Sequence, residues 1–143
     1  MRTRAMEVED APAVAALSVQ LGYPATAGEM ERRMLLLREN ADHGLFVVED
    51  AGGGVVGWVH VCGEHLLVSP PYAEVGGLVV DDEARGVGVG RALMAEAERW
   101  ARGRGYRDVR VRSGTARTGA HAFYQRIGYR LVKSQHRFVK TLE

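Results

Sequence analysis

One short stretch of the chain has the composition of an anion-binding loop. Glycines alternate with small residues between two arginines, and an apolar helical pattern follows at once: Arg85, Gly86, Gly88, Gly90 and Arg91. Glycine allows tight backbone turns in which several N–H groups face one ligand. The start of a helix adds unpaired N–H donors and a positive dipole end. The stretch therefore suits a phosphate group, and a purely structural glycine turn is the alternative.

Two common phosphate-binding loops fit this stretch poorly. A nucleotide-triphosphate P-loop requires lysine and then serine or threonine after its last glycine, whereas Arg91 and Ala92 follow Gly90. The dinucleotide fingerprint requires a third glycine one step further on and a turn tight against its strand. Here the residues DDEAR separate the loop from the preceding strand. Both ligand classes are therefore disfavoured.

The elements that would hold the loop follow from hydrophobic periodicity and turn chemistry. We expect a strand at Thr3–Val8, a helix capped by Asp10, and a second helix from a Thr26/Glu29 capping box to about Glu39. The next strands are expected at Leu45–Glu49 and Val55–Cys62, joined by a hairpin turn, DAGGG, and at Tyr72–Val80, where Gly76 and Gly77 indicate a bulge.

The second half of the chain continues the alternation. The helix after the glycines is expected to end at Gly103 or Gly105, and DVRVR is expected to be a strand that turns Val109 and Val111 inward. A short helix, TGAHAFYQRIG, and two final strands, YRLVK and QHRFVKTL, complete the chain. This order predicts an α/β fold with a mixed sheet.

Composition limits the classes of protein to consider. The chain has 143 residues, 46% hydrophobic and 26% charged, with a net charge of +1, which is typical of one soluble domain over residues 1–143. Its only cysteine, Cys62, has no disulfide partner and reads as a small core residue. No apolar run spans a bilayer and no signal peptide is apparent, so we expect a cytoplasmic protein without membrane contact. A homodimer is the commonest assembly of soluble oligomers.

Two motifs at the expected separation resemble those of the GNAT N-acetyltransferase superfamily. The glycine stretch from Arg85 to Gly90 is similar to its Arg/Gln-x-x-Gly-x-Gly/Ala motif, and AHAFYQRIGYR is similar to its Ala-x-x-Phe-Tyr-x-x-x-Gly-Phe/Tyr signature. The strand AEVGGLVV stands where the family's acetyl-CoA-binding strand should be. The resemblance covers Tyr72 to Arg130. It implies a single-domain GNAT-like fold, with a mostly antiparallel sheet, about four flanking helices and a splay at that strand.

The resemblance also implies cofactor-binding residues for acetyl-CoA. The pyrophosphate would lie against the loop backbone, with charge from its two arginines: Arg85, Gly86, Val87, Gly88, Val89, Gly90 and Arg91. The pantetheine arm would run along Leu78, Val79 and Val80 like an added strand, and the Leu78 N–H would stabilise the carbonyl oxygen during acyl transfer. Thr115 stands where many relatives have asparagine, so a pantetheine contact there depends on its hydroxyl.

Two side chains match catalytic positions of the family. Tyr124 would protonate the departing thiolate, and its alternative role is a packed aromatic ring beside Phe123. Glu74 would accept the amine proton directly or through water; it could instead attract a cationic substrate or pair with an arginine. No metal site is expected, because His60 and His65, which could line an acceptor pocket, lack a third ligand.

The sequence therefore predicts an acetyl-CoA-dependent N-acetyltransferase. It would move an acetyl group to a primary amine of a small acceptor by direct attack in a ternary complex, and Glu64 and Glu74 favour a cationic acceptor. One alternative is an acetyl-CoA-binding sensor or interaction module without turnover. The other is a nucleic-acid-binding domain that uses the arginines between residues 99 and 117, although no aromatic interleaving or recognition motif accompanies them.

Overall fold

A computed structural model of the chain describes all 143 residues and divides into two units, Met1–Val111 and Arg112–Glu143. The first unit contains the sheet and three α-helices: β1 (Arg2–Ala5), α1 (Ala11–Leu21), α2 (Ala27–Arg38), β2 (His43–Glu49), β3 (Val55–Glu64), β4 (Tyr72–Val80), α3 (Val89–Gly103) and β5 (Val109–Val111). Two 3-10 turns, η1 (Val8–Asp10) and η2 (Asp82–Ala84), precede α1 and α3. The second unit contains α4 (Thr118–Arg126).

The sheet has five strands in the order β1-β2-β3-β4-β5. The first three pairings are antiparallel, and β4 pairs with β5 in parallel. The expected α/β class, with a mixed and mostly antiparallel sheet and four α-helices, is confirmed. None of the helices combines the length and the hydrophobicity that crossing a membrane requires.

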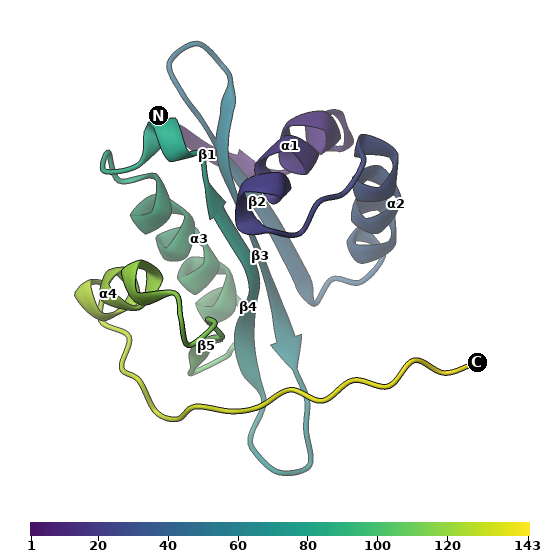
Figure 1. The fold of residues 1–143 in the computed structure, drawn as a ribbon, viewed down its shortest axis with the longest axis vertical. Helices are drawn as coiled ribbons and strands as arrows, with labels where there is room; N and C mark the ends of the chain where they lie inside the picture. Colours follow the sequence, from purple (N-terminus) through teal and green to yellow (C-terminus); the bar gives the residue numbers. More distant parts are fainter. The chain divides into compact units, whose positions relative to one another are not determined.

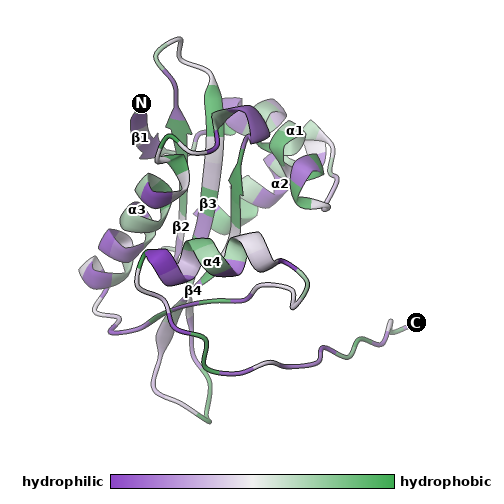
Figure 2. Ribbon diagram, turned by 60° about the vertical axis from the view of Figure 1, so that its left-hand side comes forward, coloured by the Kyte–Doolittle hydropathy of each residue, from purple (hydrophilic) through white to green (hydrophobic).

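Helices cover both faces of the sheet in the first unit (Figure 1). On one face, Trp58 of β3 packs against a buried cluster from the α1 and α2 side: Met6, Ala11, Val14, Met34 and Val47. On the other face, α3 lies so close to β3 that a Cβ on Gly57 would be 2.8 Å from Val89 Cγ1 and 3.0 Å from Leu93 Cδ1. Figure 2 shows the hydrophilic outer side of α3, opposite the apolar residues that it buries.

Local chemistry explains the turn and cap that the sequence predicts. In the turn between β2 and β3, the Asp50 carboxylate accepts hydrogen bonds from the N–H groups of Gly52 and Gly54 at 3.0 and 2.9 Å. At the start of α2, the Thr26 hydroxyl accepts from the Glu29 N–H at 3.1 Å while the Glu29 carboxylate accepts from the Thr26 N–H at 3.0 Å. Both predictions are confirmed.

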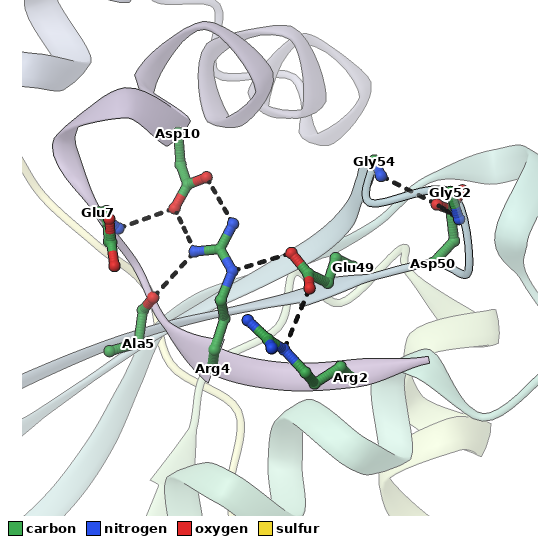
Figure 3. A network of polar contacts seen from close by, with 9 residues as sticks. All are labelled: Arg2, Arg4, Ala5, Glu7, Asp10, Glu49, Asp50, Gly52 and Gly54. Carbon is green, nitrogen blue, oxygen red and sulfur yellow. Dashed lines mark hydrogen bonds and ion pairs between the residues drawn. The ribbon is translucent and has the colours of Figure 1, made fainter.

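An ionic network holds β1 to the start of α1 (Figure 3). The Arg4 guanidinium donates two hydrogen bonds to the Asp10 carboxylate, at 2.8 and 2.9 Å, and one to Glu49 at 3.0 Å. Asp10 precedes α1, as predicted, but its side chain does not cap the helix. The Asp10 carboxylate accepts instead from Arg4 and from the Glu7 N–H at 2.8 Å. Because these donors occupy its oxygens, it does not accept from the first turn of α1. Its pKa is lowered, mainly by the hydrogen bonds from Arg4.

The second unit differs from the expectation at its end. The helix predicted around Tyr124 is present as α4, but residues 129–143 lie in no strand, so the prediction of two final strands is wrong. Both segments alternate apolar and polar residues, yet a strand also requires a hydrogen-bonding neighbour. None of the five strands in the sheet pairs with them, and the side chains from Leu131 onward are exposed.

Candidate functional site

The glycine loop leads into a helix whose first turn receives no side-chain cap. Gly86 and Gly88 adopt left-handed φ angles of +84° and +91°, which glycine tolerates best. A Cβ on Gly86 would meet nothing within 4 Å, and one on Gly88 would meet only the end of Met1. The space beside the loop backbone is therefore empty. Glycine is needed at positions 86 and 88 because both have left-handed φ angles.

The N-terminus of α3 is electrostatically suited to an anion. Gly88 is its N-cap residue, no side chain accepts from the first turn, and that turn contains no acidic residue. The first helical bond is donated by Ala92 to the Gly88 carbonyl, which leaves the earlier N–H groups without a helical acceptor. Arg91, exposed in the first turn, adds a cation to the positive end of the dipole. This arrangement is unfavourable by itself and favourable around a bound anion.

Arg85, the other predicted cationic residue, lies before the loop and already has a partner. Its guanidinium is 2.9 Å from Asp82 Oδ1, and both side chains are 64% exposed. An exposed ion pair of this kind contributes little to stability. Moving the Arg85 guanidinium from Asp82 to a bound anion of higher charge would therefore cost little free energy.

The pairing of β4 changes along its length, and β4 precedes this loop in the chain. A bulge shifts the β3–β4 register, so that His60 is opposite Gly77 and Val61 opposite Val75, which leaves Gly76 as the extra residue. Pairing with β5 covers only Ala73 to Val75 of β4. The predicted bulge is thus confirmed, and the splay of the sheet stays a prediction. The predicted pantetheine positions, Leu78 to Val80, lie on the part of β4 that β5 does not pair.

Glu74 lies one residue before the end of the β4–β5 pairing and is half-buried. Its Cα partners are Cys62 in β3 and Arg110 in β5, so these three side chains belong to the same face of the sheet. The Arg110 guanidinium carbon lies 3.8 Å from the centre of the Tyr72 ring. Glu74 is thus a carboxylate between the Cys62 thiol and the Arg110 guanidinium on one face of the sheet.

Tyr124 and Thr115 belong to the second unit. The Tyr124 ring packs edge-to-face against Phe123 and Tyr129, with centroid distances of 5.3 and 6.1 Å. Burial raises the pKa of its hydroxyl, and Arg117 opposes this shift. The hydroxyl is therefore protonated at neutral pH, as a general acid must be before it acts. Thr115 is exposed in the turn before α4.

The structure also brings together a cluster that sequence reasoning missed. His43 Nδ1 of β2 lies 2.9 Å from His60 Nε2 of β3, and the Cys62 thiol lies beside them. Burial and the neighbouring His43 lower the pKa of His60 to about 4, and burial raises the pKa of the Cys62 thiol to about 11. His65 is not part of this cluster, because its Nε2 contacts Asp42 and Tyr106. The alternation His60-x-Cys62 was visible in the sequence, but the register that adds His43 was not.

Comparisons with known proteins agree with this geometry. A family model described as the acetyltransferase (GNAT) family matches residues 13–129. The chain is 34% identical over 112 residues to an uncharacterized N-acetyltransferase of Methanocaldococcus jannaschii, which covers 74% of this chain but only 49% of that protein. It is 29% identical over 123 residues to an aminoglycoside N(6')-acetyltransferase of Stenotrophomonas maltophilia, which covers 83% of this chain and 80% of that protein.

The fold is also shared with solved structures. An aminoglycoside 6'-N-acetyltransferase of Acinetobacter baumannii superposes with a TM-score of 0.85 at 17% sequence identity, over 99% of both chains. The GNAT-like fold expected from the two motifs is therefore confirmed.

Proposed function

Because the chain belongs to the GNAT acetyltransferase family, we propose that it transfers the acetyl group of acetyl-CoA to a primary amine of a small acceptor. The observation that carries this proposal is that β4 continues beyond Val75, where its pairing with β5 ends, and is followed in the chain by a helix N-terminus without a side-chain cap. The first feature leaves strand hydrogen-bonding groups for an extended amide-bearing arm, and the second leaves N–H donors for a pyrophosphate. One ligand that requires both is an acyl-CoA.

The residues fit such a ligand. The space beside Gly86 and Gly88 would be occupied by a side chain at any other residue type, so a phosphate can approach the backbone there. Arg91 lies at the same helix end. A cation beside the positive end of the helix dipole is unfavourable unless an anion is bound there. In this assignment the Leu78 N–H donates to the carbonyl oxygen as negative charge develops on it. Acetyl-CoA supplies an activated thioester, and the acceptor amine attacks it directly in a ternary complex.

We assign the two proton transfers to Glu74 and Tyr124. Glu74 accepts the proton of the attacking amine, directly or through water; its place on β4, one residue before the end of the β5 pairing, supports this assignment. Tyr124 donates a proton to the leaving thiolate. Its assignment rests on the position that it holds in the family's sequence motif, and the raised pKa of its hydroxyl keeps it protonated beforehand.

We infer a cationic acceptor. Glu64 and Glu74 stand on one face of neighbouring strands, where they favour a positively charged amine. Several relatives act on aminoglycosides by name, and these are polyamines of the required charge. A screen of aminoglycosides, polyamines and amino acids, read by thiol release from acetyl-CoA, identifies the acceptor. Binding of acetyl-CoA without turnover of any amine would favour a sensor over an enzyme.

Acetyl-CoA is expected to raise the thermal unfolding midpoint of the chain, and Gly88→Asp is expected to abolish this shift. At a concentration about 100 times the dissociation constant, binding stabilises the native state by about 2.7 kcal/mol. Aspartate adds bulk and negative charge where the pyrophosphate would lie. Gly53→Asp is the matched control, because Gly53 also has a left-handed φ of +83° and open surroundings but lies in the β2–β3 turn. Equal shifts in the two variants would contradict the loop's role.

Tyr124→Phe is expected to lower turnover by about 10²–10⁴, the range for losing a positioned general acid. The loss should fall on kcat, while the thermal shift with acetyl-CoA is retained. Tyr129→Phe is the control, since its ring contacts Tyr124 and the family's motif accepts phenylalanine there. Near-normal turnover in Tyr124→Phe would leave Tyr124 as a packing residue.

A further inference from the structure

The cluster of His43, His60 and Cys62 has the composition and spacing of a metal site. One nitrogen from each imidazole and the Cys62 sulfur all lie within 4.8 Å of one another. His43 and Cys62 are directly paired across β2 and β3, and His60 is two residues before Cys62 on the same face. Three potential ligands are thus held by the register of two central strands rather than by a loop.

Glu64 offers a fourth ligand beside Cys62. Glu64 continues the same face of β3, and its Oε1 lies 3.8 Å from the Cys62 sulfur. Two nitrogens, one sulfur and one carboxylate oxygen form a set that Zn²⁺ accepts in tetrahedral geometry. Around a tetrahedral Zn²⁺, bond lengths of about 2.0–2.3 Å place neighbouring ligand atoms about 3.3–3.7 Å apart. The nitrogens are 2.9 Å apart, the sulfur is 3.8 Å from the Glu64 oxygen, and the three His and Cys ligand atoms lie within 4.8 Å of one another, so the side chains must move together to enclose an ion.

We propose that His43, His60, Cys62 and Glu64 form a binding site for Zn²⁺ or a similar divalent transition metal, on the face of the sheet that carries Glu74. The sequence-based expectation of no metal site rested on the lack of a third ligand for His60 and His65 and of a second cysteine for Cys62. In the structure, His65 contacts Asp42, and the potential ligands beside His60 are His43 and Cys62.

Binding changes the protonation of two groups. The short contact between the imidazoles contains one N–H, so binding moves that hydrogen to the other nitrogen of its ring and frees both lone pairs for the metal. The Cys62 thiol loses its proton to solvent, since the thiolate is the form that ligates. The metal would then cross-link β2 to β3. The proposal does not depend on acetyl transfer.

The test is a titration of tag-free, reduced and chelator-treated protein with Co²⁺, followed by Zn²⁺. We expect saturation at one Co²⁺ per chain, with a sulfur-to-cobalt charge-transfer band and visible bands of a tetrahedral ion, all removed when Zn²⁺ displaces Co²⁺. Cys62→Ser should abolish the charge-transfer band, and His43→Ala should weaken Zn²⁺ affinity by more than about a hundredfold, beyond the effect of losing an outer-sphere partner. His65→Ala, a neighbouring histidine outside the cluster, should leave both measurements unchanged.

The outcomes separate clearly. Circular dichroism of each variant shows whether it retains the fold, and the conservative Cys62→Ser change provides a test even if His43→Ala unfolds. The absence of saturable binding, or a charge-transfer band that persists in Cys62→Ser, would overturn the proposal. Binding without a sulfur band would overturn the ligand set. In each of these cases the contact between His43 and His60 is a structural hydrogen bond only.

Discussion

Replacing Arg4 by methionine is expected to destabilise the first unit far more than the same replacement of Arg2. Both arginines contact Glu49, at 3.0 and 3.1 Å. Arg4 also donates two hydrogen bonds to Asp10, whose side chain is only 9% exposed. Methionine keeps much of the length and apolar surface of arginine, so the comparison isolates the guanidinium.

The magnitude follows from burial. Removing one partner of a buried ion pair costs about 3–5 kcal/mol, because the other charge stays buried without compensation. The Arg4 side chain is 23% exposed, and Asp10 keeps the Glu7 N–H at 2.8 Å, so we expect about 2–4 kcal/mol for Arg4→Met. The Arg2 side chain is 69% exposed, and an exposed pair contributes about 0–1 kcal/mol.

Urea unfolding followed by circular dichroism measures both values, and the midpoint of thermal unfolding should fall by about 2–4 °C for each kcal/mol.

The difference in unfolding free energy between the two variants should also depend on pH. Arg4 lowers the pKa of Asp10 in the folded state, so the stabilisation is complete above the unfolded pKa of about 3.9 and disappears as pH falls through the lower, folded pKa. Equal losses for the two variants at pH 7, or a gap that does not narrow as pH falls below the unfolded pKa, would refute the reasoning.

Two further substitutions test local features of the fold. Thr26→Ala removes the acceptor for the Glu29 N–H and should lower the free energy of unfolding by about 1 kcal/mol, measured by urea titration; no change would mean that water caps α2 equally well. Gly63→Ala places a Cβ against the Tyr106 hydroxyl and the Asp42 carboxylate, whose hydrogen bond is 2.7 Å, and should cost about 1–3 kcal/mol in the same assay; wild-type stability would show that this network shifts freely.

The features predictable from sequence are those whose causes lie within a few residues. The Thr26 cap and the Asp50 turn each bring their donors and acceptors together over two to four positions, so residue types alone suffice. The bulge at Gly76 is similar, because paired glycines in an apolar strand indicate either a bend or a close approach. The glycine loop was readable for the same reason.

Features that depend on pairing between residues far apart in the sequence could not be predicted. Asp10 has the residue type of a helix cap, but Arg4 claims its carboxylate once β1 is placed. The His43–His60 contact requires the register of β2 against β3, which no local pattern specifies. The two final segments have the alternation of strands, and their failure to pair shows that alternation is not sufficient for a strand.

The shortness of β5 has a consequence for aggregation. Beyond Val75, half of the backbone groups of β4 point toward the side on which β5 no longer pairs, and the residues there are GGLVV, an apolar and partly β-branched run. Such an edge is a template on which another chain can add a strand. A ligand that lies along β4 would also shield this edge. The supply of that ligand would then influence how long the protein stays dispersed in solution, as well as what it does there.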